Sequence, residues 1–272
     1  MDEGRATEQK RKQQARLRCA RAERIAAAGE AEAAAQEYER ALRLDESNGE
    51  AHLGLAETYR LLDRPQRALG AYRHALRLSR NKGESHLGMA DLMVNLGRPR
   101  AAVAHLSRAV MADANRAYYR YRLGSLYMQS GAYRQARSHL EKAVALAPGE
   151  GFYHFKLGEV HFALREWEPA AAAYEAAIQR SALDDLYHLR LAAAYARQRR
   201  RRAAVGCLRR AVELRPDNPA YRCLLADQLT RLGRAEEAAD QYRRAGRLGA
   251  YDQYCLTQAR ERFGDQSLAA AG

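Results

Sequence analysis

Cysteine is scarce in this sequence, and long apolar runs are missing from it. The chain has 272 residues but only four cysteines, and no two of them stand at the short spacing of a zinc site. This pattern argues against a disulfide framework, so we expect reduced thiols. Residues 1–24 are charged throughout without an apolar signal segment, and no stretch approaches the roughly 18 apolar residues of a membrane span. We therefore expect a cytoplasmic protein with no membrane insertion.

Lysine is also rare. Only five of the 46 basic residues are lysine, so arginine carries most of the positive charge behind the formal net charge of +13. A strongly basic chain favours acidic proteins or nucleic acid as partners. A GC-rich genome also produces an arginine bias, so the placement of the charges is more informative than their total.

The motifs of common enzyme classes are absent as well. The sequence contains no phosphate-binding glycine-rich loop, no HExxH, no nucleophile elbow and no Cys-x-x-Cys. We therefore expect no enzyme activity, no catalytic residue and no cofactor.

What the sequence does contain is an uninterrupted repeat of 34 residues. Two alanine columns are filled in all seven repeats, and a column of large residues lies between them. The first alanine column is Ala34, Ala68, Ala102, Ala136, Ala170, Ala204 and Ala238, and the second is Ala41, Ala75, Ala109, Ala143, Ala177, Ala211 and Ala245. The large residues are Tyr38, Tyr72, Leu106, Leu140, Tyr174, Leu208 and Tyr242. A fixed period of this length indicates stacked supersecondary units.

The repeat resembles the tetratricopeptide repeat (TPR) family, and the resemblance covers about residues 15–252. The matching residues of the fourth repeat are Leu123, Gly124, Tyr127, Ala136, Leu140, Ala143 and Pro148. The resemblance implies an all-α fold, a right-handed α-solenoid of seven helix-turn-helix repeats whose first helices line a concave groove. Members of this family mostly hold other proteins.

The period also sets the expected domain boundaries. The seven repeats are 15–48, 49–82, 83–116, 117–150, 151–184, 185–218 and 219–252. Residues 1–14 form a polar N-terminal extension, either helical or disordered. Four-residue apolar spacing predicts a capping helix at 253–264, followed by a tail at 265–272. Four glycines share the position just after the first helix, where a left-handed residue can close it; they are Gly29, Gly97, Gly131 and Gly233.

Most of the histidines follow the same period. His52, His86, His154 and His188 share one repeat position, and His105 and His139 share another. Successive members are a whole repeat apart, so we expect structural or surface roles for them and no metal site.

The family's groove-lining positions supply the first candidate site. The candidate protein-binding residues are Tyr118, Tyr121, Arg122, Ser125, Phe152, Phe155, Lys156, Glu159, Phe162 and Arg190. Exposed aromatic clusters mark binding surfaces, so we expect Tyr121, Phe155 and Phe162 to be partly exposed and close together. The alternative is that these rings pack inward against neighbouring helices. The family subtype that clamps acidic tails with Lys and Asn is not predicted, because no such pair occupies these positions.

A dense arginine cluster supplies the second candidate site. It comprises Arg197, Arg199, Arg200, Arg201 and Arg202, and the stretch 197–247 holds 14 arginines against six acidic residues. Such density suits phosphate or an acidic protein; the alternative is a solvated turn without a ligand.

We therefore predict a non-enzymatic scaffold or adaptor that binds a peptide segment or helix of a partner protein in its concave groove. The alternative function is a polyanion- or nucleic-acid-associated solenoid that uses the arginine-rich C-terminal repeats. The sequence does not distinguish such a scaffold from an accessory domain of an enzyme. It also predicts no oligomeric state.

Overall fold

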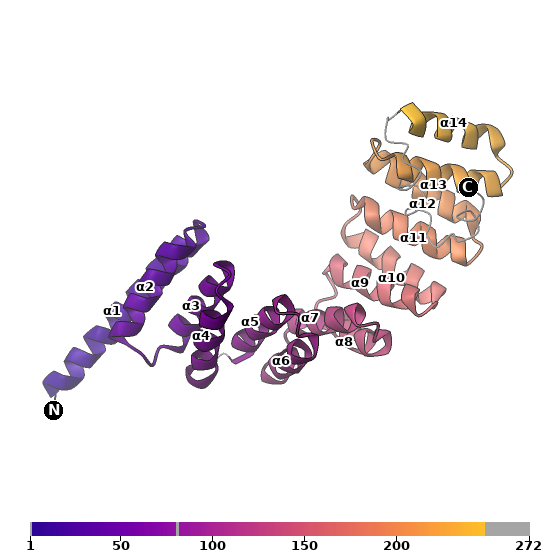
Figure 1. Cartoon of the computed structure of the whole chain (residues 1–272). Coiled ribbons are helices and arrows are strands. Elements are labelled where there is room, and N and C mark those ends of the chain that lie inside the picture. Colours follow the sequence, from indigo (N-terminus) through magenta and orange to yellow (C-terminus); the bar gives the residue numbers. More distant parts are fainter. Residues whose placement is uncertain (1, 80–81, 248–272) are drawn as a thin grey trace. The chain divides into compact units, whose positions relative to one another are not determined.

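The structure is a computed structural model that describes residues 2–79 and 82–247 (Figure 1). In this part of the chain it contains fourteen helices and no strand. The first seven are α1 (Asp2–Ala27), α2 (Ala31–Leu44), α3 (Gly49–Leu61), α4 (Pro65–Leu78), α5 (Lys82–Asn95), α6 (Pro99–Ala112) and α7 (Ala117–Gln129). The others are α8 (Tyr133–Leu146), α9 (Gly151–Ala163), α10 (Trp167–Arg180), α11 (Asp185–Arg197), α12 (Arg201–Leu214), α13 (Pro219–Arg231) and α14 (Ala235–Arg247). The all-α prediction is confirmed.

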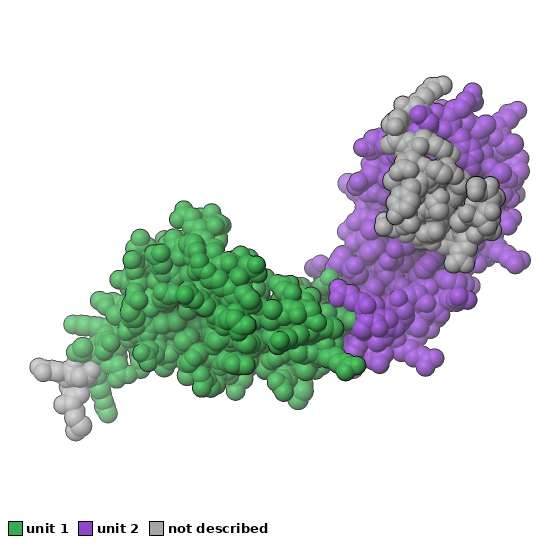
Figure 2. Space-filling model, viewed as in Figure 1, with its two compact units in different colours: residues 1–126 green, residues 127–272 purple. Residues whose placement is uncertain are grey.

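The chain forms two compact units, residues 1–126 and residues 127–272 (Figure 2). In the first unit α1 packs on α2, α3 on α4 and α5 on α6, and each pair also contacts the next pair along the chain. In the second unit the packed pairs are α9–α10, α11–α12 and α13–α14. Each pair also contacts the next one, and α8 packs on α9. Within each unit, helix pairs therefore stack in chain order, which is the arrangement of an α-solenoid. The boundary between the units falls inside α7.

The alanine columns lie where second helices meet their neighbours. Ala136 and Ala143 on α8 are both 0% exposed, and their counterparts in the other repeats are buried too. Most of the large residues between them are equally buried, and Tyr174 on α10 is 0% exposed. A Cβ atom added at Gly158 on α9 would lie 2.6 Å from the ring of Tyr174. Small residues therefore stand where a large ring from the paired helix approaches the backbone.

The turn inside each repeat has a left-handed residue. Gly29, Gly97, Gly131 and Gly233 all have positive φ, as the sequence predicts. The other three repeats place Asp63, Arg165 and Arg199 at this position, with φ of 53°, 61° and 61°. Side chains with a Cβ disfavour this region, so these three turns carry backbone strain that the glycine turns avoid.

This difference makes one stability prediction. The left-handed conformation costs a non-glycine residue about 1–2 kcal/mol of stability. Glycine avoids this cost, but it loses more conformational entropy on folding, which takes back about 0.5–1 kcal/mol of the gain. We expect Arg165→Gly to raise the free energy of unfolding by about 0.5–1 kcal/mol, measured by urea denaturation. The reverse change at the equivalent position, Gly131→Arg, should lower it. A loss of stability in Arg165→Gly would mean that the arginine side chain contributes more than the strain costs.

The predicted N-terminal extension and C-terminal capping helix can be compared with the described residues. Helix α1 begins at Asp2 and runs without a break to Ala27, so residues 2–14 of the predicted extension are helical and continuous with the first repeat. The predicted capping helix at 253–264 and the tail at 265–272 lie outside the described residues. None of the helices in the described ranges is both long and apolar enough to cross a membrane.

Candidate functional site

The predicted protein-binding residues fall into two sets, one in each unit. Tyr118, Tyr121, Arg122 and Ser125 lie on α7 in the first unit. The second unit holds the remaining predicted residues on α9 and α11: Phe152, Phe155, Lys156, Glu159, Phe162 and Arg190. We call the surface formed by α3, α5 and α7 the first-helix face of unit 1, and that formed by α9, α11 and α13 the first-helix face of unit 2.

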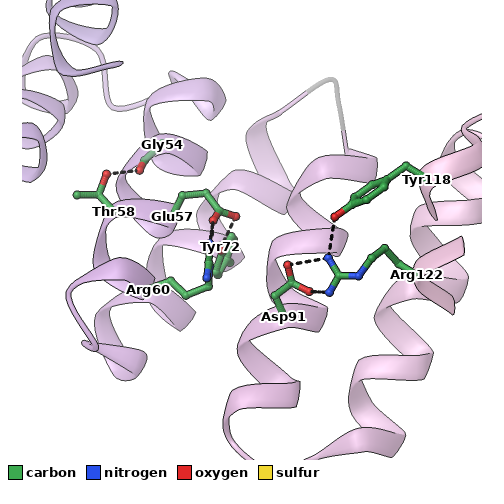
Figure 3. A network of polar contacts seen from close by, with 8 residues as sticks. All are labelled: Gly54, Glu57, Thr58, Arg60, Tyr72, Asp91, Tyr118 and Arg122. Atoms are coloured by element: carbon green, nitrogen blue, oxygen red, sulfur yellow. Dashed lines mark hydrogen bonds and ion pairs between the residues drawn. The ribbon is translucent and has the colours of Figure 1, made fainter. Parts of the chain in front are cut away.

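On the first-helix face of unit 1, an exposed tyrosine is held by a charged network (Figure 3). The guanidinium of Arg122 forms an ion pair with Asp91 on α5. Its Nη1 also donates a hydrogen bond to the Tyr118 hydroxyl, at 3.0 Å. Tyr118 is 40% exposed, and its ring centroid lies 5.9 Å from that of Tyr121. The network therefore orients an aromatic side chain that faces solvent.

Ser125 lies one turn further along α7. It is half-buried, and within the described residues its hydroxyl has no hydrogen-bond partner. Because this hydroxyl oxygen is itself buried, Ser125 offers no exposed polar atom for a partner on this face.

A second polar contact recurs between the paired helices of a repeat. Tyr72 on α4 is 0% exposed and donates a hydrogen bond from its hydroxyl to Glu57 on α3, at 2.6 Å (Figure 3). Tyr174 donates in the same way to Glu159, also at 2.6 Å. Burial, followed by the charge of the carboxylate, raises the pKa of both tyrosines. Buried hydroxyls need such a partner, because an unpaired one costs stability.

This contact has a signal in the sequence that the repeat pattern alone did not reveal. Where the large column holds tyrosine, the residue 15 positions earlier is acidic, as in the pairs Tyr38/Glu23, Tyr72/Glu57, Tyr174/Glu159 and Tyr242/Asp227. Where the column holds Leu140 or Leu208, that earlier residue is Ser125 or Ala193, but for Leu106 it is Asp91, whose carboxylate pairs with Arg122 instead. The predicted groove residue Glu159 is thus bound by a core tyrosine, and it also forms an ion pair with Arg190 at 2.9 Å. Its first role is structural.

Phe155 on the first-helix face of unit 2 corrects one expectation. It is only 4% exposed, so the prediction that it is partly exposed is wrong. Its ring stacks on Tyr187 of α11, with centroids 4.7 Å apart, and packs against Tyr174 at 5.8 Å. The large ring at the start of the next repeat's first helix covers it. The alternative of inward packing therefore holds for Phe155.

Phe152 is the exposed aromatic residue of this face. It is 41% exposed, and Leu186, its counterpart one repeat later, is 40% exposed. The ammonium of Lys156 lies 5.1 Å from the Phe152 ring centroid and 5.5 Å from that of Phe155. A cation above aromatic rings is attracted by their negative faces. Apolar and basic side chains therefore lie together here.

Phe162 lies at the other end of α9 and is half-buried. Its ring meets Trp167 edge to face, with centroids 5.1 Å apart. The guanidinium of Arg197 lies 5.5 Å from the Trp167 ring centroid, and the Gln198 side chain donates to the Trp167 carbonyl at 2.8 Å. These contacts bring the end of the first-helix face next to the predicted arginine cluster, whose five members are all exposed.

The histidine column binds the loops between repeats. A ring nitrogen of His52, His154 and His188 lies 3.1 Å from a backbone carbonyl oxygen six residues earlier in each case. Arg120, at the same repeat position, donates to the Ala114 carbonyl at 2.9 Å. At this repeat position, either histidine or arginine can therefore contact the carbonyl oxygen of the preceding loop.

His86 differs from the rest of the column. Its Nδ1 lies 3.2 Å from Nδ1 of His105, so histidines from the two columns meet within one repeat. Burial, with the nearby His105 and Arg108, lowers the pKa of His86 to about 4. In the described part of the chain, no three His, Cys, Asp or Glu side chains are grouped to hold a metal ion.

Two models of the tetratricopeptide repeat family match the chain, one at residues 60–126 and the other at residues 9–82, 121–185 and 189–252. No curated protein matches it.

Solved structures with a similar fold are known. The structure from the functional characterisation of Pseudomonas aeruginosa pilF has a TM-score of 0.67 at 20% identity, over 80% of this chain and 99% of that chain. MamA from Desulfovibrio magneticus RS-1, from residue 41 to its end, has a TM-score of 0.58 at 20% identity, over 62% and 96%. A chain of the APC/C hetero-tetramer Cut9–Hcn1 has a TM-score of 0.56 at 18% identity, over 80% and 42%. Identities this low show a common fold alone.

Proposed function

The chain belongs to the tetratricopeptide repeat family, and we propose that it is a non-enzymatic scaffold that holds a segment of a partner protein against a first-helix face. The observation that carries this proposal is the placement of Phe152 and Leu186. These apolar side chains are 41% and 40% exposed at equivalent positions of α9 and α11. Exposed aromatic and aliphatic side chains that recur on one face are typical of binding surfaces.

The surroundings of these residues indicate the chemistry of the segment. Lys156 lies beside Phe152, and Arg190 follows Leu186 by one turn on α11. The carboxylate of Glu159 is already bound by Tyr174 and Arg190. A partner segment with apolar side chains and some negative charge fits this face of unit 2. The same proposal applies separately to unit 1, where Tyr118 is the exposed and oriented aromatic residue.

Two further points support a scaffold. A structurally similar chain is part of the Cut9–Hcn1 hetero-tetramer, an assembly of more than one protein. The acidic side chains of the first-helix faces are also used in ion pairs and tyrosine hydrogen bonds, as with Asp91 and Glu159. Carboxylates occupied in this way support the fold more readily than acid–base catalysis.

The proposal predicts that Phe152→Ser with Leu186→Ser releases the partner. Each anchor contributes about 2 kcal/mol or more to binding when it fills a partner pocket, so the double variant should lose most of the captured protein. The measurement is recovery of partners from native lysate by quantitative mass spectrometry, with helical content followed by circular dichroism. Because both side chains are substantially exposed, the fold should persist.

A matched control removes two exposed apolar side chains from second helices instead. Met111 on α6 is 82% exposed and Leu146 on α8 is 39% exposed. Met111→Ser with Leu146→Ser should keep the partners that the first double variant loses. Equal recovery by wild type and the Phe152/Leu186 variant would refute this first-helix face as the binding surface in unit 2.

A further inference from the structure

The turn between α11 and α12 carries a dense positive charge that the scaffold function leaves unexplained. We call Arg197, Arg199, Arg200, Arg201 and Arg202 the arginine patch. All five side chains are exposed, and four of them, together with Ala203 and Leu232, line a shallow depression in the surface of unit 2. Like charges this close repel one another, and an anion bound between them, from the chain itself or from outside, relieves that repulsion.

The chain does not supply that anion within the described residues. Other arginines of unit 2 have carboxylate partners: Arg190 pairs with Glu159, Arg209 and Arg234 with Glu237, and Arg215 with Asp185. In the part of the chain that the structure describes, no member of the arginine patch forms an ion pair with a carboxylate. The patch therefore stands out from its surroundings by its unneutralised charge.

Three of the guanidinium groups are nevertheless held in place, two of them over aromatic rings. Arg197 lies over the ring of Trp167, and Arg200 lies over the ring of Tyr195 with 4.4 Å to the centroid. Arg201 donates to the carbonyl oxygen of Arg231 at 3.4 Å. Stacking on an aromatic ring leaves the planar fork of N–H groups available while limiting its motion, so less entropy is lost when an anion binds.

The neighbouring turns limit the size of the ligand. Arg202 occupies a repeat position that is Glu168 in the preceding repeat and Glu236 in the following one, and both glutamates are exposed. The neighbouring turns, which also contain Arg165 and Arg234, therefore have mixed charge. A long polyanion that crossed several repeats of this unit would meet these carboxylates. A short acidic segment would contact the patch alone, and this argues against a nucleic acid strand.

The aromatic side chains point to the same conclusion. Proteins that bind single strands stack bases on exposed aromatic rings. Here the rings of Trp167 and Tyr195 are already occupied by arginines. Carboxylates need no stacking surface, and they match the fork of a guanidinium with two parallel hydrogen bonds. We propose that the arginine patch binds a short acidic peptide segment, rich in Asp or Glu, of a partner protein.

The experiment uses the full chain and a fluorescent hexaglutamate peptide, followed by anisotropy at low and physiological salt. We expect Arg199→Gln, Arg200→Gln, Arg201→Gln and Arg202→Gln together to weaken binding about tenfold or more, because several charge-assisted hydrogen bonds are lost. The control variant carries Arg209→Gln, Arg210→Gln, Arg243→Gln and Arg244→Gln. It loses the same net charge on α12 and α14, and its affinity should stay within about twofold of wild type because its arginines lie outside the patch.

Three outcomes would overturn the proposal. If the wild-type chain does not bind hexaglutamate at low salt, the acidic-peptide site does not exist. Equal weakening in both variants would make the attraction a property of net charge alone. Tighter binding of an oligothymidine strand of about 20 nucleotides than of the peptide, lost in the patch variant, would make the patch a nucleic-acid site instead. The Phe152/Leu186 variant should still bind hexaglutamate, so failure of the scaffold proposal is distinguishable from failure of this one.

Discussion

Replacing Phe155 by alanine is expected to lower the free energy of unfolding by about 3–5 kcal/mol. The side chain is 4% exposed and lies between Tyr174 of its own repeat and Tyr187 of the next. Its removal leaves a cavity that two large rings from different helices cannot easily collapse to fill. The change therefore weakens both the repeat itself and its contact with the following repeat, which are the two terms that stabilise a repeat protein.

The matched control is Phe152→Ala, one turn earlier on the same helix. Phe152 is 41% exposed, so its truncation removes less buried surface and should cost about 1 kcal/mol or less. Guanidinium denaturation of both variants measures the difference. A similar loss of stability in the two variants would show that Phe155 is no more buried than Phe152.

Alkaline pH is expected to destabilise the folded chain steeply between about pH 10 and 12. Burial raises the pKa of Tyr38 to about 12, and that of Tyr195 also to about 12 with a contribution from the carboxylate of Glu175. Burial raises the pKa of Tyr72 and Tyr174 as well. In the unfolded chain tyrosine ionises near its ordinary pKa of about 10, whereas in the folded chain these groups keep their protons.

The sign and size follow from the proton count. Above about pH 10 the unfolded state binds fewer protons than the folded state, so the free energy of unfolding falls as pH rises. Each such tyrosine contributes about 1.4 kcal/mol per pH unit until its folded-state pKa is reached. Burial also raises the pKa of Cys19 and Cys207 to about 11. Cysteine ordinarily ionises at about pH 8.5, so each of these thiols adds a loss of similar size that begins at this lower pH.

Denaturation midpoints measured at constant ionic strength from pH 8 to 11.5 test this expectation. The variant Tyr72→Phe removes one titrating group and should reduce the slope of stability against pH by about 1.4 kcal/mol per pH unit above pH 10. Tyrosinate absorbance, recorded in parallel, should rise together with unfolding. A slope unchanged in Tyr72→Phe would show that this hydroxyl ionises while the chain is folded.

The repeat architecture was predictable from the sequence because it rests on intervals that every repeat shares. The 34-residue period places alanine where second helices meet their neighbours, and Ala136 and Ala143 are fully buried accordingly. The same reasoning located the left-handed turn position at Gly131, since a helix that ends in a tight turn needs positive φ there. These features depend on local geometry that repeats, so one sequence with seven copies contains enough information to find them.

The exposure of individual side chains was decided by the tertiary structure. Phe155 and Tyr121 occupy equivalent positions in neighbouring repeats, yet Phe155 is buried because Tyr187 covers it, whereas Tyr121 remains partly exposed. The meeting of His86 with His105 likewise depends on how two helices pair, not on the spacing within either histidine column. A period states which positions are equivalent, but burial depends on all the surrounding side chains. The counterpart of Tyr187 one repeat earlier is again a tyrosine, Tyr153, whereas the counterpart of Tyr174 is the smaller Leu140.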